Sequence, residues 1–158
     1  MYCTMIRENF PSMLKMMEDI IKILYVCDGE GGSMEEKQAR LKKFPENTVI
    51  VKEGEIQTEM YKILSGKVAV YINYGEKNEY LLGVLSEQKC FGETCILCKK
   101  PSPYTIIAVY DVLAMRISED EFDDFVQNNT KNATDIIKNL AREVVNLRWN
   151  LDMVIDEL

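Results

Sequence analysis

The pattern of hydrophobic and polar positions predicts that the first part of the chain is helical. From Pro11 to Cys27, apolar residues recur at every third or fourth position with charged residues between them, which indicates an amphipathic helix. The segment from Asp28 to Ser33 reads DGEGGS and is typical of a flexible connector, because it is rich in glycine. Met34 to Lys43 then has the composition of a short charged helix. We therefore expect an N-terminal helical segment with a Gly-rich connector over residues 1–44.

Residues 45–118 change in character to short apolar runs separated by turn residues. The predicted strands are Val49–Lys52, Tyr61–Leu64, Lys67–Ile72, Tyr80–Leu85, Tyr104–Val109 and Val112–Ile117. The dipeptide Ser65-Gly66 joins the second and third of these and predicts a β-hairpin, and Tyr110-Asp111 predicts a second hairpin between the last two. Because turn signals recur at intervals of about 8–12 residues, the fold class is mainly β, a sandwich or barrel with flanking helices.

Helical signals return at Ser118 and continue over residues 119–158. Ser118 is a good N-cap, and the three acidic residues that follow it suit the positive end of a helix dipole. After a break at Asn128 to Asn132, a long helix is predicted over residues 133–156, with apolar residues at a heptad spacing. These residues are Ile137, Leu140, Val144, Leu147, Leu151 and Val154. This helix either packs only on its own barrel or pairs with its copy in a homodimer, and we favour the homodimer.

Composition and charge exclude several classes of protein. The chain has 26 acidic and 19 basic residues and a net charge of −7, so it is a poor candidate for binding nucleic acid by itself. It contains no histidine, which excludes the usual Ser-His-Asp and Cys-His catalysis and all metal sites built on imidazole. No apolar run is long enough to span a bilayer, and the first residues do not form a signal peptide. The five cysteines cannot all pair, and free thiols fit a reducing compartment, so we expect a cytoplasmic protein that does not bind membranes.

Three of the cysteines lie close together in the sequence, at Cys90, Cys95 and Cys98. Their spacing matches three of the four thiolates of a plant-type iron–sulfur loop, but no fourth cysteine follows Cys98. The alternatives are a redox-sensing thiol pair at Cys95 and Cys98, or small residues that pack a loop beneath the barrel. We favour packing and expect no metal.

Four motifs in a fixed order resemble a known family. They are VIVKEGE (Val49–Glu55), YKILSGKVAVY (Tyr61–Tyr71), CFGET (Cys90–Thr94) and IIAVYDVLAMRISEDEFDDF (Ile106–Phe125). Together they are similar to the cyclic-nucleotide-binding domain of the catabolite activator and fumarate-nitrate regulator family. The resemblance implies a double-stranded β-helix, or jelly-roll barrel, with a dimerisation helix at its C-terminal end. Regulators of this family continue into a DNA-binding domain, which we expect this chain to lack.

The resemblance also implies a ligand site in a phosphate-binding cassette over residues 90–105. In the family, phosphate lies over the short helix after the glycine that Gly92 matches, and a glutamate that Glu93 matches binds the ribose hydroxyl. The implied ligand-binding residues are Phe91, Gly92, Glu93, Thr94, Ser102, Tyr104 and Thr105.

The cassette departs from the family at the residue that pairs with phosphate. The family's arginine corresponds to Ser102, or to Pro103 if the loop is one residue longer, and no arginine occurs between Arg40 and Arg116. An ionised hydrogen bond contributes about 1.5–3 kcal/mol, so its loss weakens binding by about ten- to a hundredfold or more. Lys99 and Lys100 are close in sequence, but a mobile ammonium does not reproduce a bidentate guanidinium.

The leading hypothesis is a dimeric small-molecule sensor domain, related to transcription regulators, with a non-standard ligand. Tyr61, Tyr71, Tyr80 and Tyr104 are candidates to line its pocket. We expect no enzymatic activity, no cofactor and at best weak binding of a cyclic nucleotide. The alternative is a ligand-free dimerisation module with a degenerate pocket. An enzyme of the cupin type is disfavoured because such barrels hold a metal with histidines.

Overall fold

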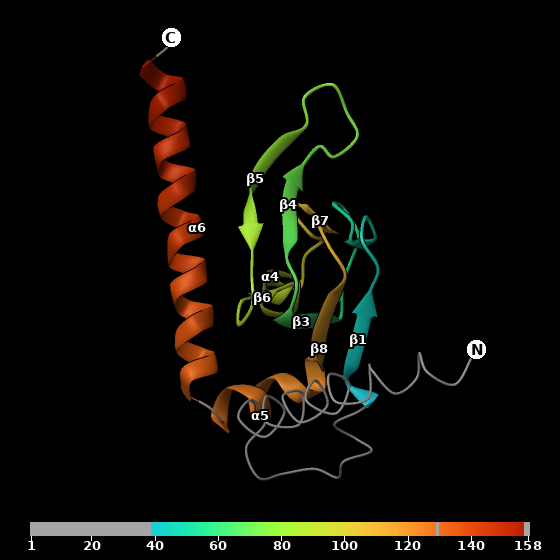
Figure 1. Ribbon diagram of the computed structural model, residues 1–158. Coiled ribbons are helices and arrows are strands. Elements are labelled where there is room, and N and C mark those ends of the chain that lie inside the picture. Colours follow the sequence, from blue (N-terminus) through green and yellow to red (C-terminus); the bar gives the residue numbers. More distant parts are fainter. Residues whose placement is uncertain (1–38, 129, 157–158) are drawn as a thin grey trace, which may run out of the picture. The chain divides into compact units, whose positions relative to one another are not determined.

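The computed structural model describes residues 39–128 and 130–156, with side chains described up to residue 148 apart from Leu147 (Figure 1). The chain divides into two compact units, Met1–Ala39 and Arg40–Leu158. The fold below is that of the second unit. The helix predicted at Pro11–Cys27, the connector after it and the first half of the helix predicted at Met34–Lys43 lie outside the described residues.

Two four-stranded antiparallel sheets form the body of this unit. The first has the order β1 (Leu41–Phe44), β8 (Val112–Ser118), β3 (Glu59–Ser65), β6 (Cys90–Phe91). The second has the order β2 (Val49–Val51), β7 (Thr105–Ala108), β4 (Val68–Ile72), β5 (Tyr80–Leu85). The predicted fold class, mainly β in a jelly-roll arrangement with flanking helices, is confirmed.

Both predicted hairpins are wrong, because each turn carries the chain from one sheet to the other. β3 pairs with β6 and β8, whereas β4 pairs with β5 and β7. The turns at Ser65-Gly66 and Tyr110-Asp111 lie against each other, since a Cβ on Gly66 would come within 2.5 Å of the carbonyl oxygen of Asp111. Gly66 also has a φ of +94°, a conformation that favours glycine. A two-residue turn with glycine therefore marked the change of direction here but not the pairing partner.

The barrel begins earlier than predicted. Leu41–Phe44 is strand β1, which pairs with β8, so the helix expected over Met34–Lys43 cannot extend through Leu41. The charged composition of this segment predicted a helix, but pairing with β8 satisfies its backbone groups and overrides that weak preference. The ring of Phe44 packs edge-on against Tyr61, with 5.4 Å between ring centroids.

The main core lies between the two sheets. Its buried residues are Val51, Tyr61, Ile63, Val68, Val70, Phe91, Tyr104, Ile106, Ala108, Val112 and Ala114. Strand β3 is buried on both faces: Tyr61 and Ile63 point into this core, while Met60, Lys62 and Leu64 alternate with them and are also buried. The two-sided burial explains why β3 lacks a clear alternation of polar and apolar residues.

A buried polar contact joins β3 to the beginning of the last helix, α6 (Thr130–Asp156). Lys62 Nζ donates a hydrogen bond to Asn132 Oδ1 at 2.7 Å, and Asn132 Nδ2 donates to the carbonyl oxygen of Phe125 at 3.3 Å. Lys62 is 3% exposed and Asn132 is 1% exposed. An ammonium in such a place needs its acceptor, because burying a charge without one is costly.

We therefore expect Asn132→Ala to destabilise the domain by about 2–3 kcal/mol, the cost of leaving a buried charged donor without its acceptor. The double variant Lys62→Met, Asn132→Leu should recover most of this loss, because replacing both partners by apolar residues is nearly neutral. Urea denaturation of the three proteins measures the difference. A double variant that is as unstable as Asn132→Ala would contradict this account.

Three helical segments follow the barrel: the 3₁₀ helix η1 (Glu119–Glu121), α5 (Phe122–Gln127) and α6. Ser118 starts η1 as predicted, and its N–H and hydroxyl both donate to Glu121 Oε2 at 2.9 Å. Burial by itself raises the pKa of Glu121, but these bonds and the nearby Arg40 outweigh it and leave that pKa below its usual range. Helix α6 begins at Thr130, earlier than the predicted residue 133, and residue 129 is outside the described part.

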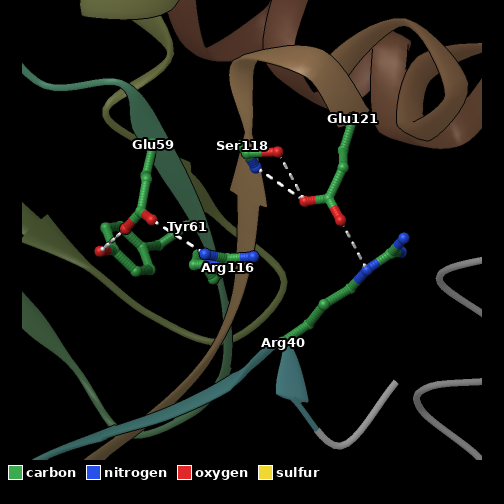
Figure 2. A network of polar contacts seen from close by, with 6 residues as sticks. All are labelled: Arg40, Glu59, Tyr61, Arg116, Ser118 and Glu121. Atoms are coloured by element: carbon green, nitrogen blue, oxygen red, sulfur yellow. Dashed lines mark hydrogen bonds and ion pairs between the residues drawn. The ribbon is translucent and has the colours of Figure 1, made fainter. Parts of the chain in front are cut away.

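Figure 2 shows two groups of polar contacts at this end of the barrel, one around Glu121 and one around Glu59. Arg40 Nε lies 3.0 Å from Glu121 Oε1, which joins the beginning of β1 to η1. Arg116 Nη1 on β8 donates to Glu59 Oε1 at 3.1 Å, and the hydroxyl of Tyr61 donates to Glu59 Oε2 at 2.8 Å. Burial, and then the bond to Glu59, raise the pKa of Tyr61.

Candidate functional site

The site is organised by a tight turn between β6 and the short helix α4 (Glu93–Cys98). Gly92 precedes α4 with a φ of +84°, and a Cβ there would lie 3.1 Å from the carbonyl oxygen of Glu59. Both the backbone conformation and the close approach of β3 therefore require glycine. The turn places Glu93 and Thr94 in the first turn of α4, directly after the buried Phe91.

A cavity of about 760 Å³ lies between the barrel and helix α6, which runs alongside β5 (Figure 1). Its apolar wall comes from β4, β5, β6 and β7: Val70, Ile72, Tyr80, Leu82, Val84, Leu85, Phe91 and Ile106. The cassette region contributes Lys89, Cys90, Glu93, Thr94, Pro103 and Tyr104. Helix α6 contributes Asn139, Arg142, Glu143 and Asn146. The volume is within the range of small-molecule sites, which is about 300–1,000 Å³.

Four of the seven residues predicted to bind a ligand lie on this wall: Phe91, Glu93, Thr94 and Tyr104. Gly92 shapes the turn behind them. The remaining two residues instead hold the cassette loop to the turn after β2. The N–H of Ser102 donates to the carbonyl oxygen of Glu55 at 2.8 Å, and Thr105 Oγ1 accepts from the N–H of Glu53 at 3.1 Å.

The structure decides which of the two candidate positions for the family's arginine faces the cavity. Ser102 is buried in the loop, where its N–H donates to Glu55 and its carbonyl accepts from Gly54. Pro103 lies on the cavity wall. Of these two positions, only Pro103 belongs to the described wall of the cavity, and a proline side chain has no hydrogen-bond donor.

Lys99 and Lys100, the two lysines of the cassette, lie away from the cavity, whereas Lys89 lines it. Lys99 forms an ion pair with Glu119, and Lys100 is exposed at the loop tip. Neither belongs to the described wall of the cavity.

Sequence reasoning missed the contribution of α6. Asn139, Arg142, Glu143 and Asn146 have the spacing i, i+3, i+4, i+7, which places polar side chains on one face of a helix. This spacing was a readable signal, but a polar helical face usually points to solvent. Only the position of α6 beside the barrel shows that the face borders a cavity.

One corner of the cavity is acidic, and it consists of Glu93, Tyr104 and Glu143. Glu93 is 2% exposed, and its Oε2 has no hydrogen-bond partner among the described residues. Burial raises the pKa of Glu93 to about 7 against the opposing effect of its own backbone bond, and the negative charge of Glu143 adds a smaller increase. Burial, Glu143 and Glu93 likewise raise the pKa of Tyr104. The Tyr104 hydroxyl lies 3.1 Å from Thr94 Oγ1.

The four candidate tyrosines divide into two groups. Tyr80 and Tyr104 line the cavity, and Tyr104 is buried in its wall without filling it. Tyr61 stacks on Phe91 in the core, with 5.3 Å between centroids, and Tyr71 packs against Tyr74.

Two of the three cysteines of the cassette are buried, as packing residues are. Cys90 and Cys95 are buried, and Cys98 is exposed. Burial raises the pKa of the Cys95 thiol, which lowers its reactivity as a thiolate. Within the described part of the chain, no three cysteine or carboxylate side chains are grouped to hold a metal ion.

The predicted dimerisation positions are described only in the first half of α6. Ile137 and Val144 are each 66% exposed, and Leu140 is half-buried. The side chains of Leu147, Leu151 and Val154 lie outside the described residues.

The family model described as "Cyclic nucleotide-binding domain" matches residues 41–129. This chain belongs to the cyclic nucleotide-binding domain family. The matched range covers every strand of the barrel and the cassette, so the domain accounts for most of the described fold.

Relatives of this domain occur in proteins of different kinds. It is 24% identical over 128 residues to "Potassium channel KAT1" of Oryza sativa subsp. japonica, covering 79% of this chain and 18% of the channel. It is 25% identical over 115 residues to the "CRP-like cAMP-activated global transcriptional regulator" of Mycobacterium tuberculosis, covering 73% of this chain and 51% of the regulator. The chain thus spans about half of the regulator and less of the channel.

A solved structure confirms the fold. The catabolite activator protein of Thermus thermophilus superimposes with a TM-score of 0.63 at 20% identity, over 83% of this chain and 62% of that one. Among the residues described here, we find no helix with an apolar stretch of the length needed to cross a bilayer.

Proposed function

We propose that this domain is a regulatory sensor that takes a small molecule other than a cyclic nucleotide in the cavity between its barrel and α6. The observation that carries the proposal is the composition of that cavity: it is large enough for a ligand, yet its deepest charged group is the unpartnered carboxyl of Glu93. Membership of the family supports the sensing role. The absence of an arginine from the cassette supports a ligand other than a cyclic nucleotide.

A cyclic phosphate is a poor match for the cassette end of the cavity. Phosphate binding there relies on a guanidinium, and Pro103 stands where it would face the ligand. Glu93 would then face an anion without that cation. Arg142 borders the same cavity, but its Nη1 donates to Asn139 on its own helix at 3.4 Å and the residue is exposed. An exposed cation is screened by water and compensates a buried charge weakly.

A ligand in this cavity would touch both halves of the domain. It contacts the strands through residues such as Leu82 and the helix through residues such as Asn139 and Glu143. Because a ligand shifts an equilibrium only through different affinities for two states, contacts to α6 are the means by which it would change how this helix is held. We further propose that α6 pairs with its copy through Ile137, Leu140 and Val144, which would pass the signal to the partner.

The pairing proposal predicts that Val144→Glu converts the protein from dimer to monomer, because a carboxylate in a helical seam costs several kcal/mol when buried. Val145→Glu is the matched control: Val145 is also exposed, at 52%, but lies outside the heptad positions. Sedimentation equilibrium of the full chain measures both. A monomeric wild type, or equal effects of the two substitutions, would contradict the pairing.

The sensing proposal is tested with a diverse fragment library and amide NMR spectra of the full chain. We expect several fragments to shift resonances of cavity residues on both β5 and α6. The control is Leu82→Trp, which places an indole ring in the cavity and should weaken those shifts while retaining the fold. If no fragment shifts the cavity resonances, the alternative holds, and the domain is a ligand-free module.

A further inference from the structure

We propose that the cavity recognises an organic cation, with a protonated amine or amidine held between Glu93 and Glu143 and an apolar or aromatic body along β4 and β5. This inference rests on the proposed function and names the class of ligand that the same site would take.

The side chain of Glu93 is almost completely buried on the cavity wall, and its Oε2 accepts no hydrogen bond from the described residues. A buried acceptor without a donor costs about 1–3 kcal/mol, and more when it is charged. A ligand that brings a donor to this oxygen removes that cost, and a cationic donor forms the stronger, charge-assisted bond.

Glu143, an exposed residue of α6, lines the same cavity, and its negative charge adds a small increase to the pKa of Glu93. Two carboxylates that face one space repel each other, and a cation between them relieves the repulsion. The ring of Tyr104 lies in the same corner, and aromatic faces attract cations.

The cavity also has two basic side chains, Lys89 and Arg142, but they do not reverse the preference for a cationic ligand. Arg142 is exposed and Lys89 is partly exposed, so water solvates both. The carboxyl of Glu93 has lost that solvation. The charge that a ligand can satisfy with the largest gain is therefore the buried negative one.

The remainder of the wall sets the body of the ligand. Val70, Ile72, Leu82 and Ile106 form an apolar surface beside the acidic corner, and Tyr80 adds an aromatic ring at its edge. A flat or branched hydrocarbon body on an amine suits this combination, because it buries apolar area while its charged end remains bound.

The test uses two sets of probes that differ in charge at constant shape: benzamidine, benzamide and benzoate, and tryptamine, indole-3-ethanol and indole-3-acetate. Saturation-transfer NMR and titration with the full chain at pH 8 measure binding of each. We expect the cation of each set to bind at least tenfold more tightly than its neutral and anionic partners. Glu93→Gln combined with Glu143→Gln should abolish this preference, and the exposed control Glu87→Gln should not change it.

Each outcome has a distinct meaning. Equal binding of the three members of a set, or preference for the anion, overturns the cation while leaving a ligand-binding cavity. Failure of all six probes while unrelated fragments shift the cavity resonances overturns the cation alone. If none of the six probes binds and no fragment of the library shifts the cavity resonances, the proposed function is overturned as well.

Discussion

Glu93→Gln is expected to stabilise the domain at pH 8 and to leave its stability almost unchanged at pH 4.5. The pKa of Glu93 is about 7 in the folded domain and has an ordinary value of 4.5. Because the folded state binds the proton more tightly, the stabilisation is complete below pH 4.5 and is lost as the pH rises through about 7. At about 1.4 kcal/mol per pH unit, the loss is about 3 kcal/mol, and the neutral glutamine avoids it.

Urea denaturation of the wild type and the variant between pH 4.5 and 8 measures this difference. The wild type should lose stability over this range, and Glu93→Gln should lose less. Glu143 contributes a smaller slope of the same sign, because burial raises its pKa too, so the variant's profile need not be flat. Glu87→Gln, at an exposed position, should follow the wild type. Parallel profiles for the wild type and Glu93→Gln would mean that Glu93 is solvated in the folded domain.

Gly66→Ala is expected to destabilise the domain by about 3–4 kcal/mol. A non-glycine residue at a positive φ costs about 1–2 kcal/mol, and overpacking adds about 1–3 kcal/mol. The Cβ would meet the carbonyl oxygen of Asp111 at 2.5 Å and Cα of Val112 at 3.0 Å, which are backbone atoms that cannot move aside by a change of rotamer.

Gly54→Ala is the matched control for this prediction. Gly54 has a similar φ of +82°, but a Cβ there meets no described heavy atom within 4 Å. Its substitution should therefore cost only the conformational part, about 1–2 kcal/mol. Thermal and urea unfolding of both variants give the two values. Equal losses would show that the two turns between the sheets do not pack against each other.

The strands were predictable because the evidence for them is local. The predicted strand Tyr80–Leu85 has the bounds of β5, and Val112–Ile117 differs from β8 by one residue. Their pairing was not predictable from turn signals, because β3 and β4 are neighbours in sequence but belong to different sheets. Strand β1 was missed for the same reason: its partner β8 is distant in sequence.

The residues of the candidate site were likewise predictable where they belong to one local motif and not where they come from a distant helix. Glu93, Thr94 and Tyr104 were found because the cassette is one continuous motif with a recognisable turn at Gly92. The polar face of α6 was missed because its role depends on where a distant helix lies. Glu143 affects the pKa of Glu93 because α6 lies beside the barrel. The cassette motif therefore identified Glu93 but could not identify Glu143.

We propose that this cyclic nucleotide-binding domain has a cavity for a different ligand. The most direct measurement is calorimetric titration of the full chain with cyclic AMP and then cyclic GMP at moderate salt. We predict no binding heat at millimolar nucleotide, because the cassette presents Pro103 and Glu93 to the phosphate end. Binding in the micromolar range would contradict the claim and would show that main-chain amides or Arg142 hold the phosphate without a cassette arginine.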